Sequence, residues 1–347
     1  MKYKIGMYGG SFNPLHLGHI NNIITASNLC EKLYLVLSVT DDKNEIDHRE
    51  RFMWLKNITL DMNNVEVFEI FDKNISKETY DWKTGAKDIK DFIGKPIDVV
   101  FCGDDYKGKN RWEELYPESE IYYISRSNIN ISSTEIRNDP YKYYEYLPKC
   151  VRPYFTKKVC VIGTESCGKT TLVRNLAKFF NTTHVEEAGR YICDDAGGID
   201  NMQPYHYFEI LFKQKELEKE TLKEANKVLF IDTDSLITLY YYQLGFENTN
   251  EINLAFKNIA EGISVLNNYD LYIFLEPDVE WVQDGTRTYG EQSVREENNI
   301  KLKKIFDENN IKYVCINGDY NTRYEKSKEL VENLILVKQS ENPKGIA

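Results

Sequence analysis

The sequence predicts an α/β protein with two parallel-sheet domains, because short apolar strands alternate with helix-like segments in both halves of the chain. In the first half the strand candidates are residues 3–9, 32–38, 65–71, 97–103 and 120–125. The pattern restarts at residues 157–163 and continues at 228–232, 271–277 and 312–317. A glycine-containing loop follows the first strand of each half, and 347 residues favour two domains over one.

The domain boundary is predicted within LPKCVRPYFTKK, residues 147–158. This segment carries two prolines and a cluster of basic residues, which are typical of a connection between domains. We therefore expect a first domain over residues 1–155 and a second domain over residues 156–347.

Composition narrows the classes of function. A net charge of -11 disfavours a general binder of nucleic acid or anionic membranes, but it leaves small anionic ligands open. Seven cysteines without a CxxC pair indicate free thiols in a reducing compartment. Because the chain also lacks an apolar run of about 20 residues and a secretory signal core, we expect a cytoplasmic protein without membrane insertion.

The loop GGSFNPLHLGH, residues 9–19, has the features of a phosphate-binding loop. Two glycines permit a tight turn behind a strand, and the helix expected from about residue 17 would direct its free N–H groups at an anion. His16 and His19 lie three residues apart, so both imidazoles can reach that anion and stabilise charge on a phosphate. The other expected nucleotide-binding residues of this loop are Gly9, Gly10, Ser11, Phe12, Asn13 and Gly18.

A second phosphate-binding segment is predicted at ISSTEIR, residues 131–137. Ser132, Ser133 and Thr134 are residue types that cap a helix, and Arg137 can form a fork on phosphate oxygens.

These motifs resemble a known superfamily. HLGH, residues 16–19, resembles the (H/T)xGH signature of the nucleotidyltransferases, and GGSFNPLHLGH and ISSTEIR are similar to motifs of its nicotinamide-mononucleotide adenylyltransferase branch. The resemblance covers nearly all of residues 3–155. It implies attack of the mononucleotide phosphate on ATP, with His16, His19, Arg137 and Mg²⁺ stabilising charge. It further implies that Asp105, in CGDDY, lies near the adenosine and that Trp82 stacks on the nicotinamide ring.

The second loop, GTESCGKT at residues 163–170, fits the P-loop pattern GxxxxGK[ST] and follows a predicted strand. We expect its backbone N–H groups to hold the β-phosphate, Lys169 to bridge the β- and γ-phosphates, and Thr170 to coordinate Mg²⁺. The position of Cys167 near a helix N-terminus predicts a lowered thiol pKa and inactivation by alkylation. The other expected nucleotide-binding residues are Gly163, Thr164, Glu165, Ser166, Gly168 and Thr171.

Three further segments predict the acceptor site and a lid. VLFIDTD ends in Asp232 and Asp234, which suit Mg²⁺ through water and a ribose hydroxyl. In VEEAGR, Glu187 can accept a proton from an attacking hydroxyl and Arg190 can bind phosphate. DGTRTYGEQSVR, residues 284–295, is typical of a lid over phosphates. Its arginines are Arg287 and Arg295, and for Arg295 a solvated surface charge is the favoured explanation.

The second half resembles the ribosylnicotinamide kinase domain of the NadR family, which fuses that kinase to the adenylyltransferase. EAGR, FIDTD and WVQDGTR look like the family motifs EYGR, FIDTD and WVxDGxR, with Ala188 as a departure. The resemblance implies ATP- and Mg²⁺-dependent conversion of nicotinamide riboside to the mononucleotide and then to NAD. Some members carry an N-terminal helix-turn-helix domain. Because the first strand starts at residue 3, we expect no such domain and no DNA binding.

Two alternatives stay open at this point. One is an enzyme with the same two scaffolds and another substrate pair, such as a riboflavin kinase that also synthesises FAD. It is disfavoured because that pair of activities does not normally use a P-loop kinase fold. The other is a regulatory protein that binds NAD or ATP and has weak or lost kinase activity. Intact Lys169, Thr170, Asp232 and Arg287 argue against such loss. The oligomeric state is open, a homo-oligomer included.

Overall fold

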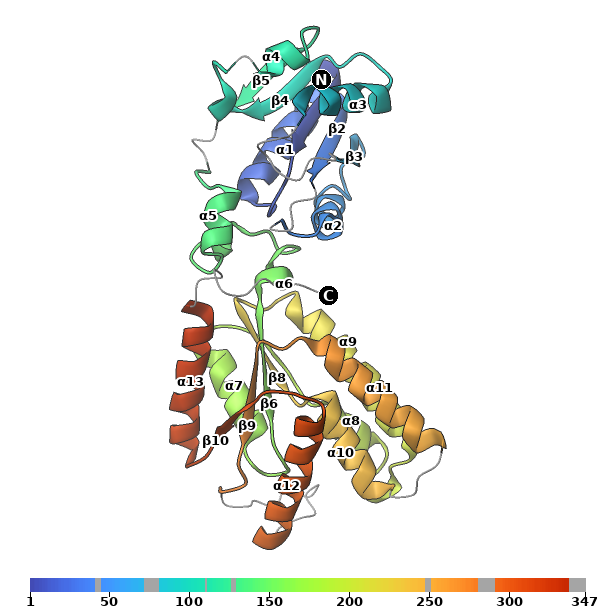
Figure 1. Ribbon diagram of the computed structural model, residues 1–347, viewed down its shortest axis with the longest axis vertical. Coiled ribbons are helices and arrows are strands. Elements are labelled where there is room, and N and C mark those ends of the chain that lie inside the picture. Colours follow the sequence, from blue (N-terminus) through green and yellow to red (C-terminus); the bar gives the residue numbers. More distant parts are fainter. Residues whose placement is uncertain are drawn as a thin grey trace. The chain divides into compact units, whose positions relative to one another are not determined.

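The computed structural model describes residues 1–40, 45–71, 81–109, 111–125, 129–246, 251–279 and 291–336 (Figure 1). The chain divides into two compact units between Val151 and Arg152, a few residues before the predicted boundary. Each unit contains one five-stranded parallel sheet, which confirms the predicted fold class.

The sheet of the first unit has the strand order β3-β2-β1-β4-β5. Its strands are β1 (Tyr3–Gly10), β2 (Cys30–Val39), β3 (Val65–Phe71), β4 (Val99–Gly103) and β5 (Glu120–Ile124). Its helices are α1 (Leu17–Leu29), α2 (His48–Ile58), α3 (Trp82–Ile93), α4 (Arg111–Leu115) and α5 (Ser133–Asn138), with short 3₁₀ turns η1 (Asp104–Tyr106) and η3 (Tyr144–Tyr146). Because side chains alternate along a strand, Val36 packs with Ile89 of α3 on one face, and its neighbours Leu35 and Leu37 are buried on the other.

The sheet of the second unit has the strand order β10-β9-β6-β8-β7. Its strands are β6 (Lys157–Ile162), β7 (His184–Val185), β8 (Val228–Asp232), β9 (Leu271–Leu275) and β10 (Val314–Ile316). Its helices are α6 (Arg152–Phe155), α7 (Lys169–Phe179), α8 (Ala188–Asp195), α9 (Pro204–Leu222), α10 (Ser235–Gly245), α11 (Glu251–Asn267), α12 (Gln292–Glu308) and α13 (Tyr320–Leu336), with the 3₁₀ turn η4 (Ile199–Asn201).

Two cores cover the two faces of this second sheet. Val159 and Val161 of β6 pack with residues of α7 and α13, whereas Cys160 and Ile162 pack with residues of α9, α10 and α12. Figure 1 shows the same division, with α7 and α13 on one side of the strands. The alternation along one central strand therefore accounts for both layers of helices.

The strand orders place both predicted loops at equivalent points. β1 lies between β2 and β4, and β6 lies between β8 and β9, so the chain reverses its direction of winding beside each of these strands. Ligands of open parallel sheets bind at this kind of switch point, outside the carboxyl ends of the strands. The first loop, residues 9–19, begins with the last two residues of β1, and residues 163–170 directly follow the carboxyl end of β6.

The structure also bears on the cysteines and on membrane insertion. All seven cysteines are free thiols. Four of them are buried, whereas Cys150 and Cys193 are partly buried and Cys315 is exposed. Within the described ranges, no helix has the length and hydrophobicity that a membrane span requires.

We predict that Gly6→Ala destabilises the first unit, because a Cβ at this position of β1 would overlap Cys30 Sγ and lie 3.0 Å from the Phe101 ring. Overpacking of this kind costs about 1–3 kcal/mol of the free energy of unfolding, which denaturant titration measures. The control is Gly262→Ala in α11, where a Cβ meets nothing within 4 Å. Replacing that helical glycine should stabilise by up to about 1 kcal/mol. Equal stabilities of Gly6→Ala and the original protein would contradict the tight packing around β1.

Candidate functional site

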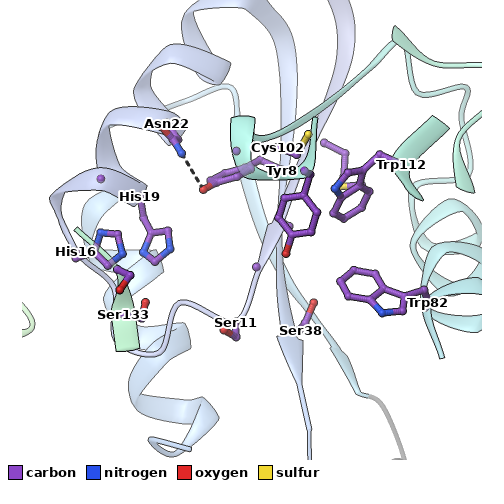
Figure 2. A pocket seen from close by; sticks show the side chains of 18 of the residues that line it. Tyr8, Ser11, His16, His19, Asn22, Ser38, Trp82, Cys102, Trp112 and Ser133 are labelled. Carbon is purple, nitrogen blue, oxygen red and sulfur yellow. Dashed lines mark hydrogen bonds between the residues drawn. The ribbon is translucent and has the colours of Figure 1, made fainter. Parts of the chain in front are cut away.

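A pocket of about 430 Å³ lies at the carboxyl end of the first sheet (Figure 2). Its wall combines the end of β1, the first turn of α1, the end of β4 and the start of α5. The predicted residues that line it are Gly9, Gly10, Ser11, His16, Gly18, His19, Trp82, Ser132, Ser133 and Thr134. The fold therefore brings residues from both predicted phosphate-binding segments to one cavity.

The two histidines of the first loop form a stacked pair. Their ring centroids are 3.8 Å apart and the ring planes differ by 23°. A Cβ at Gly18 would lie 3.0 Å from the His16 ring, so glycine between the histidines lets that ring approach the helix. The edge of Phe12 contacts His19 at a centroid distance of 5.0 Å. Phe12 thus supports the pair from behind and is itself buried.

Two arginines hold the outer side of this loop. Arg51 Nη1 donates to the Ser11 carbonyl oxygen at 2.8 Å, and Arg51 is fully buried beside Glu45, with Nη2 3.2 Å from Oε2. Burial lowers the pKa of Arg51, and the charge of Glu45 opposes that shift. Arg137 donates to the Asn13 carbonyl oxygen and, at 3.2 Å, to Thr134 Oγ1. The loop backbone is thereby fixed by guanidinium groups from α2 and α5.

The start of α5 has the capping geometry that ISSTEIR predicts. Ser132 Oγ accepts from the Glu135 N–H at 3.2 Å, and Glu135 Oε2 accepts from the Ser132 N–H at 2.9 Å. Ser133 Oγ donates to the Pro14 carbonyl oxygen at 3.0 Å, which ties α5 to the first loop. A reciprocal capping box of this kind satisfies two backbone N–H donors of the first helical turn and fixes the start of the helix.

Aromatic side chains form the opposite wall of the pocket. Trp82 is the first residue of α3, and Asp81 caps that helix by accepting from the Lys83 and Thr84 N–H groups. The Trp82 ring meets Trp112 edge-on at 5.7 Å, and the Arg111 guanidinium lies 4.7 Å from its centroid. The sequence suggested Trp82 alone. The other aromatic lining residues are Tyr106, which ends the CGDDY segment, and Tyr8, Trp112 and Tyr116, which belong to no predicted motif.

Two predicted residues of the first unit have different surroundings. Asn13 is buried, and its Oδ1 accepts from the Ile46 N–H at 3.2 Å, so this side chain holds the loop instead of lining the cavity. Asp105 lies in η1 beside the lining residue Tyr106 and does not itself line the pocket.

A second pocket, of about 710 Å³, lies at the carboxyl end of the second sheet. The predicted residues that line it are Glu165, Ser166, Gly168, Lys169, Thr170, Thr171, Glu187 and Arg190. Residues without a sequence signal complete the wall from α9 and α10, among them Tyr207, Gln214, Thr238 and Tyr241. Gln214 Oε1 accepts from the Ala188 N–H at 2.8 Å, so it also positions the start of α8.

The P-loop has the backbone that its glycines predict. Gly163 and Gly168 have φ angles of +144° and +88°, which side chains rarely tolerate. A Cβ at Gly163 would lie 2.7 Å from the Leu275 carbonyl oxygen, so β9 approaches too closely for any other residue. Lys169 opens α7, and its Nζ donates to the Thr164 carbonyl oxygen at 2.9 Å.

The prediction for Cys167 is wrong. Its thiol is fully buried and donates to the Thr164 carbonyl oxygen, with Sγ and O 2.9 Å apart. Burial raises the pKa of Cys167, and the nearby Lys169 and Arg323 charges oppose this only in part. The thiol is therefore enclosed behind the loop, without the exposure that alkylation requires.

Thr170 and Glu187 line the second pocket, and Asp232 is buried behind Thr170 without lining the pocket itself. Thr170 Oγ1 donates to Asp232 Oδ2 at 2.5 Å, while Asp232 Oδ1 is buried without a hydrogen-bond partner in the described part of the chain. Burial raises the pKa of both Asp232 and Glu187, and the charge of Lys169 opposes each shift. The Thr170 and Asp232 oxygens fit a hard divalent cation whose other ligands come from water or substrate.

Asp234 does not fit its predicted role. Its carboxylate caps α10 by accepting from the Leu236 N–H at 2.8 Å, and it accepts from Asn267 Nδ2 at 2.7 Å and the Tyr272 hydroxyl at 3.1 Å. The group is buried and does not line the pocket, so it stabilises the fold.

The two predicted lid arginines differ in what the structure describes. Arg287 lies outside the described residues. Arg295 is neither a solvated charge nor an exposed lid residue. It is buried in α12, where Nη1 donates to the Val279 carbonyl oxygen at 2.9 Å and to Gln292 Oε1 at 3.2 Å.

Comparisons with known proteins agree with the two sites. The cytidylyltransferase-like family model matches residues 7–139, and the AAA domain model matches residues 158–323. The chain is 29% identical to the trifunctional NAD biosynthesis/regulator protein NadR of Escherichia coli K12, over 96% of this chain and 84% of that protein. A phosphopantetheine adenylyltransferase of Mycoplasma mycoides is 34% identical, over 39% of this chain and 94% of that protein.

Solved structures give the same result for the whole chain. A NadR protein in complex with NR superposes with a TM-score of 0.80 at 25% identity and covers 97% of both chains. A NadR protein in complex with NAD and AMP-PNP superposes with a TM-score of 0.79 at 23% identity and covers 98% of both chains.

We predict that Asp232→Asn raises the free energy of unfolding at neutral pH. Burial raises the native pKa of Asp232, so the original protein loses stability as the pH rises from the ordinary aspartate value through the raised native one. Asparagine does not titrate, so the advantage of the variant should grow above about pH 4, by up to about 1.4 kcal/mol per pH unit. Denaturant unfolding between pH 3 and pH 8 measures this difference. A variant that becomes less stable than the original protein as pH rises would contradict the raised pKa.

Proposed function

The chain belongs to the NadR family, and we propose that it converts nicotinamide riboside to NAD in two ATP-dependent steps. Its two domains are a kinase and a nucleotidyltransferase. The observation that carries the proposal is the presence of two separate phosphate loops, each at the switch point of its own sheet and each beside its own pocket. The NadR relatives are named for NAD biosynthesis, and one NadR structure holds NR.

In the proposed first step, the second unit phosphorylates the riboside. The 5′-hydroxyl oxygen attacks the γ-phosphorus of ATP as the bond to the β–γ bridging oxygen breaks, and ADP leaves. Glu187 accepts the hydroxyl proton, a role supported by its place in the pocket and by the burial that raises its pKa. Lys169 and the P-loop N–H groups neutralise the phosphate charge.

The kinase step would use Mg²⁺, which Thr170 would hold directly and Asp232 through water. Mg²⁺ neutralises charge on the transferred phosphate when it is bound. The support in this chain is the Thr170–Asp232 contact of 2.5 Å together with the second, unpartnered oxygen of that carboxylate.

In the proposed second step, the first unit transfers an adenylyl group. A phosphate oxygen of the mononucleotide attacks the α-phosphorus of a second ATP, and pyrophosphate leaves, so no covalent enzyme intermediate is needed. His16 and His19 line the cavity where the phosphates would lie. Arg137 belongs to α5, is not among the lining residues and holds the loop through the Asn13 carbonyl oxygen. Positioning and charge stabilisation therefore carry this step.

We predict that Lys169→Ala abolishes riboside phosphorylation and leaves adenylyl transfer to supplied mononucleotide nearly unchanged, whereas His19→Ala does the reverse. In the described part of the chain, His19 lines the pocket of the first unit and Lys169 that of the second. Product chromatography with each substrate measures both activities, and a loss of about 100-fold or more is expected in the affected one.

The same pair of variants can overturn the proposal. Loss of both activities in either folded variant would contradict two independent sites. Tight binding of NAD by the original protein without turnover of either substrate would favour a regulatory binding protein.

We predict that Trp82→Ala raises the KM for the mononucleotide about 10-fold, with little change in the KM for ATP. Stacking of a base on an aromatic side chain contributes about 1–3 kcal/mol, and the pyridinium ring carries a positive charge that also favours an indole face. The control is Phe92→Ala, because Phe92 lies on the same helix, is exposed and does not line the pocket. Equal KM values for the mononucleotide in the two variants would rule out stacking on Trp82.

A further inference from the structure

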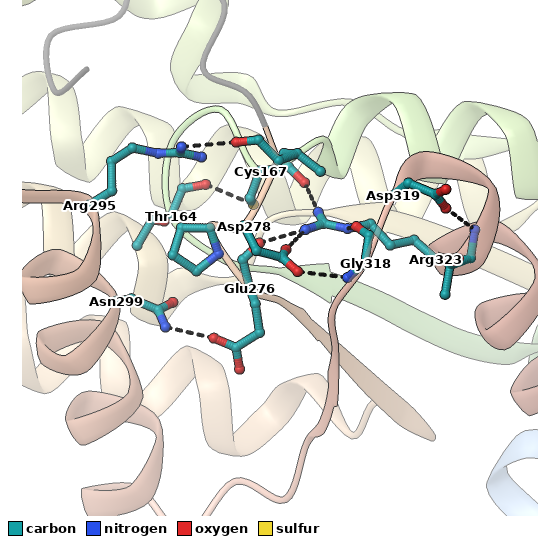
Figure 3. A network of polar contacts seen from close by, with 12 residues as sticks. Thr164, Cys167, Glu276, Asp278, Arg295, Asn299, Gly318, Asp319 and Arg323 are labelled. Atoms are coloured by element: carbon teal, nitrogen blue, oxygen red, sulfur yellow. Dashed lines mark hydrogen bonds and ion pairs between the residues drawn. The ribbon is translucent and has the colours of Figure 1, made fainter. Parts of the chain in front are cut away.

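Arg323 joins three distant segments of the second unit through one buried guanidinium (Figure 3). Nη1 donates to the Cys167 carbonyl oxygen of the P-loop at 2.5 Å. Nε donates to the Gly318 carbonyl oxygen at 2.7 Å, and Nη2 donates to the Glu276 carbonyl oxygen at 2.8 Å. No motif in the sequence pointed to this residue, which lies 156 positions from its P-loop partner.

The contact with Cys167 controls the direction of a neighbouring N–H group. In a trans peptide the carbonyl of one residue and the N–H of the next point in opposite directions. Because Arg323 holds the Cys167 carbonyl, the Gly168 N–H is directed away from Arg323. A P-loop binds phosphate through such inward N–H groups, so the orientation of this peptide affects the ligand directly.

The charge of Arg323 is balanced by a carboxylate that is itself fixed. Asp278 forms an ion pair with Nη2, and its other oxygen accepts from the Gly318 N–H at 2.7 Å. The Arg323 side chain is buried whereas that of Asp278 is 40% exposed, so removing Asp278 would leave a buried cation without its counter-charge. The first unit has a comparable contact, in which buried Arg51 donates to the Ser11 carbonyl oxygen of its own loop at 2.8 Å.

We propose that Arg323 is a positioning residue for phosphate binding, which sets the P-loop peptide between Cys167 and Gly168 through its contact with the Cys167 carbonyl. The inference rests on the proposed kinase function of the second unit. Arg323 should therefore affect the binding of ATP and leave the binding of the riboside unchanged.

The test compares Arg323→Ala and Arg323→Lys with Glu325→Gln, an exposed position of the same helix whose side chain pairs only with Lys328 among the described residues. A small misplacement of reacting groups costs about 100-fold in rate, so we expect Arg323→Ala to lose about that factor in kcat/KM for ATP. The KM for nicotinamide riboside should not change. Arg323→Lys, which keeps one cationic donor, should recover part of the loss, and Glu325→Gln should match the original protein.

Binding of AMP-PNP makes the test independent of turnover. Because the first unit also binds ATP, the isotherm of Lys169→Ala is subtracted to isolate the P-loop site. Weaker AMP-PNP binding at this site in the Arg323 variants supports the proposal even if the original protein phosphorylates no riboside. That combination would overturn the proposed kinase function and leave the role of Arg323 intact. Unchanged binding in both variants overturns the proposal.

A purely structural role gives a different pattern. It predicts parallel increases in the KM for ATP and the KM for the riboside, which follow the fall in unfolding temperature, and that pattern also overturns the proposal. If Arg323→Ala does not fold, the same comparison of the kinetic constants for ATP and for the riboside is made with Arg323→Lys and Asp278→Asn.

Discussion

Buried cationic side chains hold the carbonyl groups of both phosphate loops, and the geometry of both sites depends on these contacts. A loop that directs N–H groups at a ligand must turn carbonyl groups the other way, and buried carbonyls need donors. Arg51 supplies the donor for Ser11, and Arg323 supplies it for Cys167. The glycines permit the unusual backbone angles, but long-range contacts select one orientation of each peptide.

Sheet topology explains why these loops adjoin pockets large enough for substrates. In each unit the loop follows a central strand, at the point where the strand order changes direction and successive strands are added on the other side of that strand. Each loop therefore adjoins residues that come from other strand ends and helix starts, such as Thr134 in the first unit and Glu187 in the second. The mononucleotide is the proposed product of one unit and the proposed substrate of the other, so one chain needs both acceptor pockets.

Local sequence predicted the features that depend on backbone geometry. Apolar strands, the P-loop and the capped helix at Ser132 all follow from short-range patterns, and the structure contains each of them. Features that depend on side-chain direction were less predictable. Thr233, with a φ of +87°, separates Asp232 from Asp234, so one carboxylate contacts Thr170 and the other caps α10. The Cys167 thiol also points into the core instead of toward the helix N-terminus.

The account as a whole is tested most directly by chromatography of the products formed from ATP, Mg²⁺ and nicotinamide riboside, sampled over time with the purified protein. It predicts that the mononucleotide and ADP appear first and that NAD and pyrophosphate follow. Unchanged riboside in a protein that still binds ATP would contradict the account.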